Sequence, residues 1–570
     1  MSRLLISAAH KSSGKTTISI GLCAALAARG MKVQPFKKGP DYIDPMWLGH
    51  ASGRPCFNLD PYLSSSAQIV EAFACRAASA DFCLVEGNKG LYDGLALDGS
   101  NSNAALAKLL DLPVVLVIDA RGMTRGIAPL ILGFQAFDKQ IRIGGVILNQ
   151  LGGSRHESKL RAVIEHYTDV QVLGAVGFDK QMEVVERHLG LIPSHEANDA
   201  NVRIEMIRER VSAQVDLTKI VDLANSAAAL PAAATVPPLA QQSTLRIGIA
   251  RDKAFGFYYP DDLQALEEAG AELVPFDTLT DTQLPMVDGL FIGGGFPEMF
   301  MVELAANSAL RESLRSAIDA GMPVYAECGG LMYLGRKLIW QGREYDMVGA
   351  LPFDVRMNER PVGRGYVELQ TTADFPWPSA DQDAPTATVN LRGHEFHYSS
   401  LENVAPDLKF AYTVKRGHGI DGNHDGIVYH NALASYAHLR SGAGSDWANK
   451  FVAFIRRCKS STTTQPTPIS TDAEGYLRNL GDWSEDFVKA QAHSEQLTLQ
   501  DRHWQVIHFL RNYFDEHRVQ AQVRTMIKHF APLWPDQPAL NHYLHELFPV
   551  GGPQKQGNRL AGLLKTKGEH

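Results

Sequence analysis

Residues 3–26 read RLLISAAHKSSGKTTISIGLCAAL, and this stretch decides the fold class. The apolar run at 4–8 predicts a buried strand, and the apolar residues that recur from Ile18 onward predict a helix. A polar loop containing Gly14 joins the two. A buried strand that turns directly into a helix is typical of a parallel α/β sheet, so we expect an α/β protein.

The loop at 12–17, SSGKTT, has the residues of a phosphate-binding turn. Glycine lets backbone N–H groups wrap phosphates, the helix N-terminus favours negative charge, and lysine reaches the outer phosphates. The Thr16 hydroxyl can hold Mg²⁺. Ala9 stands where such motifs usually begin with glycine, and a serine-rich turn is the alternative, which the flanking strand and helix disfavour. The predicted nucleotide-binding residues are Ser13, Gly14, Lys15, Thr16 and Thr17.

Carboxylates for a magnesium nucleotide follow two other predicted strands. Glu86 ends the strand at 82–85, where metal-binding acids project in this architecture. Asp41 and Asp44 lie in the turn KKGPDYIDP at 37–45. Turn aspartates often only cap local N–H groups, but two acids beside two lysines favour a substrate or phosphate role.

The chain divides into three blocks by composition. The first has further buried strands at 114–118 and 146–148, and an Ala/Pro/Gln-rich linker follows at 224–244. The second block restarts as α/β and ends near Cys458, with a predicted helix at 263–269 and predicted strands at 245–250, 273–276, 289–292 and 324–326. A Ser/Thr/Pro-rich linker at 460–471 is expected to be disordered, and the last hundred residues have helical spacing.

Cys328, in YAECGG, lies at a sharp turn between a strand and a helix. Such a turn exposes a nucleophile and directs backbone N–H groups at a developing oxyanion. A cysteine in an apolar strand is more often a buried hydrophobe, but the two glycines favour the nucleophile. A thiolate needs a base, and His438, His394 and His397 are all candidates that spacing cannot separate.

Composition limits the compartment and the partners. The 570 residues suit several domains, and the net charge of −8, with no long basic tract, disfavours nucleic acid. The six cysteines form no CxxC pair, which argues against a disulfide framework and a structural zinc site. No signal-peptide layout and no apolar run of membrane-spanning length occur, so we expect a cytoplasmic protein without a membrane partner.

Several motifs in residues 1–458 resemble the cobyrinate a,c-diamide synthase family. They are FKKGPDYIDP (36–45), NLD (58–60), EG with GLYDG (86–94), RHLGL (187–191), GGFPE (294–298), AECGGLMYL (326–334) and GHEFH (393–397). The resemblance implies a dethiobiotin-synthetase-like ATPase domain at 1–223 and a class I glutamine amidotransferase domain at 245–458. It also implies ATP- and glutamine-dependent amidation of peripheral acetates of a tetrapyrrole, with ATP as co-substrate and Mg²⁺ as cofactor.

The same resemblance implies residue roles. Cys328 forms a glutamyl thioester and His438, in SYAHL, is its base; Asn149 recognises adenine. The implied metal ligands are Thr16, Asp41 and Glu86, and the residues implied to face phosphate or substrate are Lys37, Asp41, Tyr42, Asp44 and Asp93. Arg440 replaces a second histidine of the family, and Ala8-Ala9 replaces its Gly-Thr.

The implied mechanism couples two sites. ATP converts a carboxylate, a poor electrophile, into an acyl phosphate while Mg²⁺ and lysines neutralise charge. Ammonia released at Cys328 must reach that intermediate without becoming ammonium, so an enclosed passage between the domains is implied.

Residues 472–570 resemble the sulfur-carrier family that includes the gamma subunit of dissimilatory sulfite reductase. Shared motifs are GYL (475–477), DW (482–483), LFP (547–549), GP (552–553) and RLAGL (559–563). The family's two cysteines correspond to Asn558 and Glu569, so no sulfur can be carried and a docking or regulatory module, or a degenerate passenger, is expected.

This fusion leaves the substrate open. Cobyrinate is the first choice, and the attached domain favours sirohaem, the cofactor of that reductase. A non-catalytic tetrapyrrole-binding or sulfur-relay docking protein is an alternative of another class, which the joint presence of Cys328, Lys15 and Glu86 disfavours. The expected partners are a tetrapyrrole, glutamine and a sulfur-pathway protein, with a homodimer as one assembly considered.

Overall fold

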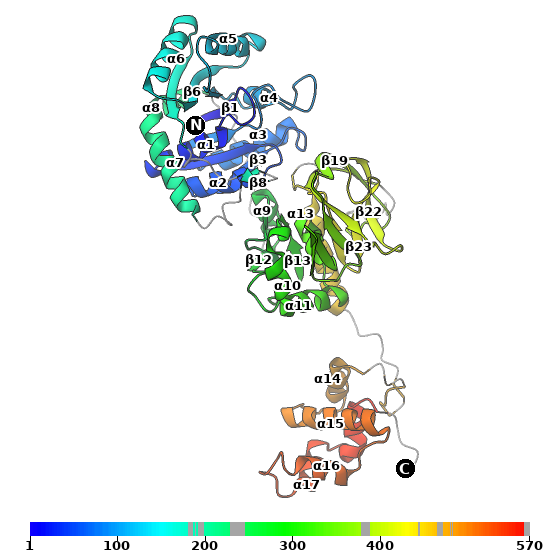
Figure 1. Ribbon diagram of the computed structural model, residues 1–570. Helices are drawn as coiled ribbons and strands as arrows, with labels where there is room; N and C mark the ends of the chain where they lie inside the picture. The colour runs from blue at the N-terminus through cyan, green and yellow to red at the C-terminus, as the bar shows by residue number, and fades with distance from the viewer. Residues whose placement is uncertain are drawn as a thin grey trace. The chain divides into compact units, whose positions relative to one another are not determined.

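The computed structural model describes residues 1–179, 199–228, 245–377, 388–442, 445–463, 471–472, 474–478, 480 and 483–563, with the backbone alone at 186–187 and 190–191. It divides into two compact units, Met1–Lys459 and Ser460–His570 (Figure 1). The first unit contains two α/β domains, and the second is mainly helical. The predicted fold class is confirmed.

The first domain is built on a parallel sheet of seven strands in the order β3-β2-β4-β1-β5-β6-β7. Successive residues of a strand point to opposite faces, and Leu4 and Ile6 therefore join one apolar core while Leu5 joins the other. The strands are β1 (Ser2–Ala8), β2 (Val33–Lys38), β3 (Phe57–Leu59), β4 (Phe82–Glu86), β5 (Val114–Asp119), β6 (Ile143–Leu151) and β7 (Gln171–Gly177). A separate antiparallel pair joins β8 (Glu186–Arg187) and β9 (Gly190–Leu191).

Helices cover both faces of this sheet (Figure 1). One face carries α1 (Lys15–Ala28), α2 (Ile43–Ser52), α7 (Ala200–Gln214) and α8 (Leu217–Asn225). The other carries α3 (Ser66–Ala77), α4 (Asn103–Leu109), α5 (Ile127–Phe137) and α6 (Ser154–Tyr167). Because α8 continues to Asn225, the start of the predicted linker at 224–244 is helical; residues 229–244 lie outside the described ones.

The second domain has a nine-stranded mixed sheet, β12-β10-β13-β15-β24-β23-β22-β19-β20. Its first five strands are parallel and its last four join by antiparallel pairing. The strands are β10 (Leu245–Ala250), β12 (Ala271–Phe276), β13 (Gly289–Ile292), β15 (Val324–Glu327), β19 (Gly363–Thr371), β20 (Asn390–His397), β22 (Lys409–Arg416), β23 (His424–Tyr429) and β24 (Ala432–Ser435). Sequence patterning found the parallel strands β10, β12, β13 and β15 but not the antiparallel half.

Smaller elements complete this domain. Two short sheets are also present. One pairs β11 (Phe255–Phe257) with β14 (Gly294–Gly295), and the other has the strand order β17-β16-β18-β21. The latter strands are β16 (Lys337–Trp340), β17 (Arg343–Asp346), β18 (Asp354–Met357) and β21 (Ser399–Glu402). The helices are α9 (Pro260–Glu268), η2 (Pro297–Phe300), α10 (Met301–Ala306), α11 (Ser308–Asp319), α12 (Gly329–Leu334) and α13 (Trp447–Thr463).

The second unit has one apolar core, formed mainly by its amphipathic helices. These are α14 (Glu485–Ser494), α15 (Asp501–His517), α16 (Val523–Phe530) and α17 (Leu540–Leu547), followed by the π-turn η4 (Pro553–Gly557) and the short α18 (Asn558–Leu560). The predicted linker at 460–471 is wrong at its start, because α13 extends to Thr463; residues 464–470 lie outside the described ones.

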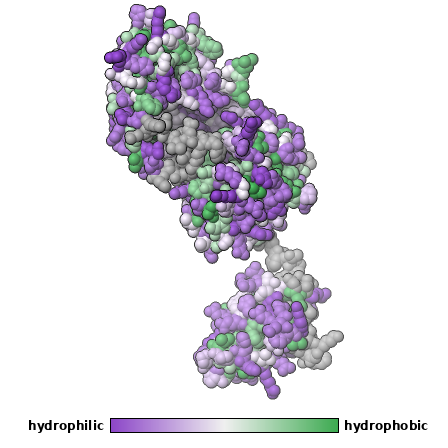
Figure 2. All heavy atoms as spheres, in the orientation of Figure 1, coloured by the Kyte–Doolittle hydropathy of each residue, from purple (hydrophilic) through white to green (hydrophobic). Residues whose placement is uncertain are grey.

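The face shown in Figure 2 is mainly hydrophilic, with hydrophobic side chains in scattered patches. Within the described parts of the chain, no helix combines the length and the apolar character needed to cross a bilayer.

Candidate functional site

Cys328 lies at the turn where β15 ends and α12 begins. Its backbone is left-handed, with φ 47° and ψ −99°, a conformation that a non-glycine residue rarely adopts. The two residues that follow pack too closely for side chains: a Cβ on Gly330 would collide with the Ile292 carbonyl, and one on Gly329 would lie 2.9 Å from the Gly295 nitrogen. These glycines therefore allow the turn that positions the thiol, which is 8% exposed.

His438 and Glu327 form a buried pair beside this thiol. The His438 Nδ1 lies 3.0 Å from Glu327 Oε2, and the Tyr325 hydroxyl and the Leu439 N–H donate to Oε1 at 2.6 and 3.0 Å. Burial lowers the pKa of His438, but hydrogen bonds with Cys328 and Glu327 outweigh it and raise that pKa to about 10. No role was predicted for Glu327, although it directly precedes the cysteine.

The other two candidate histidines have different surroundings. His394 stacks on His438 at 4.9 Å, and burial together with the His438 charge holds its pKa well below the usual range. His397 stacks on Tyr436 at 3.7 Å, and its Nδ1 pairs with the Ser399 carbonyl at 2.8 Å. The contacts with Cys328 and Glu327 therefore favour His438 as the partner of the thiol.

Glu327→Gln is expected to lower the pKa of His438 and to slow glutamine hydrolysis about 100-fold, because the amide removes the charge facing the imidazole. The raised pKa means that protonated His438 stabilises the fold fully below pH 6.5, and that this contribution is lost as the pH rises through about 10. In the variant this loss should begin at lower pH. To measure the change in the pKa of His438, the folded wild type and variant are alkylated over a series of pH values. The modification of Cys328 is then quantified on the peptide isolated after digestion.

Tyr325→Phe is the matched control, since it removes one donor to Glu327 but leaves the carboxylate facing His438. An alkylation profile for Glu327→Gln that coincides with the wild-type profile would contradict the assignment.

The phosphate loop opens α1 as the sequence predicted. Gly14 has φ 85°, which favours glycine, and a Cβ there would collide with the Asn149 amide. Asn149 donates to the Ser13 carbonyl at 2.9 Å, and the Ser13 hydroxyl donates to the His10 carbonyl at 2.8 Å. Asn149 thus supports the loop from β6, and its contact with adenine stays a prediction.

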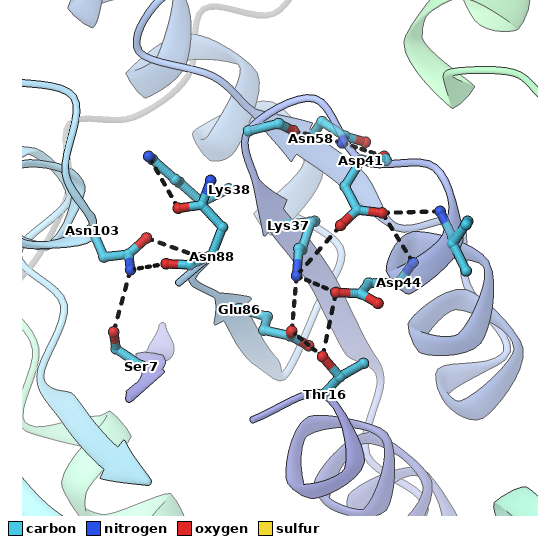
Figure 3. A network of polar contacts seen from close by, with 12 residues as sticks. Ser7, Thr16, Lys37, Lys38, Asp41, Asp44, Asn58, Glu86, Asn88 and Asn103 are labelled. Atoms are coloured by element: carbon cyan, nitrogen blue, oxygen red, sulfur yellow. Dashed lines mark hydrogen bonds and ion pairs between the residues drawn. The ribbon is translucent and has the colours of Figure 1, made fainter. Parts of the chain in front are cut away.

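Lys37, Thr16 and the carboxylates of Asp44 and Glu86 gather beside the loop (Figure 3). Lys37 pairs with Asp44 and, at 2.8 Å, with Glu86; Thr16 donates to Glu86 at 2.8 Å and to Asp44 at 3.3 Å. Burial opposes the Lys37 charge, but Asp44 and Glu86 raise its pKa well above the usual value. Burial and the neighbouring Lys37 lower the pKa of Lys15. An anionic phosphate would relieve this repulsion between the lysines.

Asp41 lies at the edge of this cluster, 3.7 Å from the Lys37 nitrogen. Its Oδ1 accepts from the backbone of Ile43 and Asp44 at 3.0 and 3.1 Å, so it also caps the start of α2. Burial, followed by the Asp44 charge, raises its pKa to about 7.

A magnesium site fits the donors present. Thr16, Asp44 and Glu86 converge, and Glu86 Oε2 is buried without a hydrogen-bond partner. Among the described residues, no group of three or more His, Cys, Asp or Glu side chains could hold a metal alone. The hydroxyl and carboxylates here would therefore share the ion with phosphate oxygens.

Two predicted phosphate or substrate residues lie elsewhere. Tyr42 packs between Phe257, at 5.3 Å, and His438, at 5.3 Å, in the second domain, and its contact with phosphate or substrate stays a prediction. Asp93 is exposed and accepts from the Gly90 N–H at 2.8 Å, as a turn residue does. RHLGL at 187–191 lies largely outside the described residues.

Two asparagines that the sequence left without a role hold the loops of this site. Asn58 donates to the carbonyls of Gly39 and Asp41 at 2.8 and 2.7 Å. Asn103 donates to the carbonyls of Asn88 and Gly90 at 2.6 and 2.8 Å. The motif NLD at 58–60 could have indicated a role for Asn58, whereas no feature of the sequence distinguished Asn103.

Arg440 joins the two domains of the first unit. Its guanidinium pairs with Asp261 and donates to the Asn58 carbonyl, and it lies 5.3 Å from the Tyr259 ring centroid. The arginine that departs from the family histidine therefore bridges the second domain and strand β3, whose Asn58 holds the Asp41 carbonyl.

Family models match three parts of the chain. Residues 5–192 match the CobQ/CobB/MinD/ParA nucleotide binding domain, residues 246–444 the CobB/CobQ-like glutamine amidotransferase domain, and residues 463–568 DsrC like protein. The NMR structure of Allochromatium vinosum DsrC is 37% identical, with a TM-score of 0.17, over 18% of this chain and 90% of that chain.

Among the curated relatives, the cobyrinate a,c-diamide synthase of Magnetococcus marinus is 46% identical over 80% of this chain and 97% of its own length. That of Methanosarcina acetivorans is 42% identical over 80% and 96%. Fold, site and relatives together define a glutamine-dependent ligase that forms amide bonds and uses ATP. The chain belongs to the cobyrinate a,c-diamide synthase family.

Proposed function

We propose that the protein amidates peripheral acetate carboxylates of cobyrinate, with ATP and glutamine as co-substrates. The observation that carries this proposal is the 46% identity to a cobyrinate a,c-diamide synthase over 80% of the chain. The buried Cys328–His438–Glu327 group and the Lys37–Asp44–Glu86 cluster, both within the first unit, support it.

The amidotransferase half would release ammonia. Cys328 attacks the glutamine carboxamide, and His438 gives the proton that it holds between Cys328 and Glu327 to the departing nitrogen, so that ammonia leaves. Water then hydrolyses the thioester and restores the proton to this pair. Glu327 holds the imidazole in place and stabilises its positive charge.

The ATPase half would activate the acid. Lys15 and Lys37 stabilise the charge of the transferring phosphoryl group, while Thr16, Glu86 and the aspartates Asp41 and Asp44 would hold Mg²⁺. The acid oxygen attacks the γ-phosphorus, ADP leaves, and ammonia then displaces phosphate from the acyl phosphate. Hydroxylamine supplied in place of ammonia should trap the acyl phosphate as a hydroxamate.

The domain interface offers a route for ammonia. Tyr42 touches the His438 ring and is two residues from Asp44, which pairs with Lys37. Buried polar atoms without hydrogen-bond partners occur at His394 Nδ1 and Asn58 Oδ1. Such atoms can accept hydrogen bonds from ammonia in transit. We place the passage alongside Tyr42.

Tyr42→Ala is expected to uncouple the two halves. Without the ring between the domains, water enters and ammonia escapes, so the glutamine hydrolysed per amide formed should rise severalfold. Glutamate and product quantified in one reaction give this ratio. Tyr42→Phe keeps the ring and should stay coupled; an unchanged ratio in Tyr42→Ala would remove the passage from this position.

Sirohaem amidation is the second candidate, favoured by the match of residues 463–568 to DsrC like protein. No cysteine follows Cys458, so this domain would serve docking to a sulfur-pathway protein and not sulfur transfer. Cobyrinate and sirohaem offered together, with products identified by mass spectrometry, distinguish the substrates. Amide formation on neither would contradict both candidates.

A further inference from the structure

A cavity of about 350 Å³ lies in the first unit, where the two domains meet. It is lined from the ATPase domain by the turn after β3 and the loop before α4, and from the amidotransferase domain by β20 and β22. Its residues are Pro61, Tyr62, Leu95, Ala96, Ser100, Asn101, Arg392 and Arg416. None of them has a role in the chemistry described above.

Two arginines give this cavity its charge. The guanidinium carbons of Arg392 and Arg416 lie 5.3 and 5.6 Å from the ring centroid of Tyr62. Arg392 also donates to the Tyr62 carbonyl at 3.3 Å, and Arg416 to its hydroxyl at 3.5 Å. Both arginines are exposed, and within the described residues no carboxylate lies at ion-pair distance from either.

The tyrosine between them is fixed. Tyr62 stacks on Tyr366 at 4.2 Å and donates to Glu368 at 2.7 Å. Glu368, on β19, is the cross-strand neighbour of Arg392 on β20 and of Arg416 on β22. The group therefore carries two positive charges and one negative charge. The excess positive charge is available to an anionic ligand.

An apolar surface lies beside this charge. The loop before α4 exposes Leu95 at 51% and leaves Leu97 fully exposed. Asn101 Oδ1 accepts from the N–H groups of Leu95 and Ala96 at 2.7 and 3.3 Å, which holds the loop in this shape. Leucines beside arginines suit a ligand that has a planar apolar ring with acidic substituents.

Short segments connect the cavity to the phosphate cluster, the group formed by Lys37, Asp44 and Glu86. Tyr366, which supports Tyr62, donates to both oxygens of Asp60 at 3.0 Å. Asp60 is two residues from Asn58, which holds the loop of Asp41. In the segment that leads to the loop before α4, the Leu91 N–H donates to the Ala8 carbonyl at 2.9 Å, next to the phosphate loop.

We infer that Arg392 and Arg416 bind carboxylates of the tetrapyrrole that are not reacting, while Leu95 and Leu97 contact the macrocycle. This site would orient one acetate toward the phosphate cluster by holding others. The inference rests on the proposed function, because it takes a polyacidic tetrapyrrole as the substrate.

Arg392→Gln and Arg416→Gln test the inference in the full-length protein. Each removes about one charge-assisted contact, and the KM for cobyrinate should rise about 10-fold in each and more in the double variant. The KM for ATP and basal glutamine hydrolysis should remain unchanged. Arg364→Gln is the matched control, since this arginine lies on the neighbouring strand β19 over Phe396 and does not line the cavity.

Direct binding separates this inference from the proposed function. Equilibrium dialysis without ATP should show weaker binding of cobyrinate to the double variant, and esterified cobyrinate should bind wild type and variant equally. If wild type amidates cobyrinate but the variants match it in KM and affinity, the inference fails alone. If wild type amidates no tetrapyrrole yet the arginines still govern cobyrinate binding, the proposed function fails alone.

Discussion

Cys328→Ala should abolish amidation with glutamine and leave amidation with added ammonia close to the wild-type rate. The thiol is the nucleophile in the proposed glutaminase step, and its loss should reduce the glutamine-dependent rate by at least about 10⁴-fold. The ATPase cluster has no contact with this sulfur among the contacts described, so it keeps its function. Rates with glutamine and with ammonium chloride at raised pH measure both halves.

Cys75→Ala is the matched control, because Cys75 is exposed on α3 and belongs to the other domain. It should match wild type with both nitrogen donors. A Cys328→Ala enzyme that still used glutamine, or that had lost the ammonia reaction as well, would contradict the assignment of Cys328 to glutamine hydrolysis alone.

Glu86→Gln should have the opposite pattern, with amidation lost from both glutamine and ammonia. The amide keeps the volume but removes the charge that faces Thr16 and Lys37 in the proposed magnesium site. We expect a fall of about 100-fold or more in both reactions, because the ion and the acyl phosphate would lose a carboxylate. Basal glutamine hydrolysis should persist.

Persistent glutaminase activity also reports that the variant is folded. Lys37 is not left unpaired in this variant, because Asp44 remains as its partner. Glu71→Gln, an exposed acid on α3, is the control for an acid-to-amide change. Amidation by Glu86→Gln at the wild-type rate with both donors would remove Glu86 from the activation step.

The sequence predicted the parts of each site that are continuous in the chain. The turn at SSGKTT was predicted because a strand, a turn and a helix follow one another there, and the turn at YAECGG was predicted for the same reason. The parallel strands that were predicted, such as β1 and β5, have long apolar runs because they are buried on both faces, whereas β3, β7 and β24 were missed. The antiparallel half was missed because its strands, such as β22, are exposed on one side and carry polar residues.

The sequence could not show which residues from distant segments come together in a site. Spacing left His394, His397 and His438 equal, and the pairing with Glu327 distinguished His438 only in three dimensions. Tyr42 lies between two aspartates in the sequence, yet its ring contacts Phe257 and His438 of the other domain.

The sequence by itself determined the α/β class, the loop that opens the first helix, the turn that carries Cys328 and the family, because short-range patterns encode local turns and burial. Only the tertiary structure decided that His438, of the three candidate histidines, lies beside Glu327 and the thiol, that Arg440 bridges the domains, and that Arg392 and Arg416 meet over Tyr62. The reason is that hydrogen bonds and charge interactions depend on distances of a few ångströms between side chains, which sheet pairing and domain packing set over hundreds of residues.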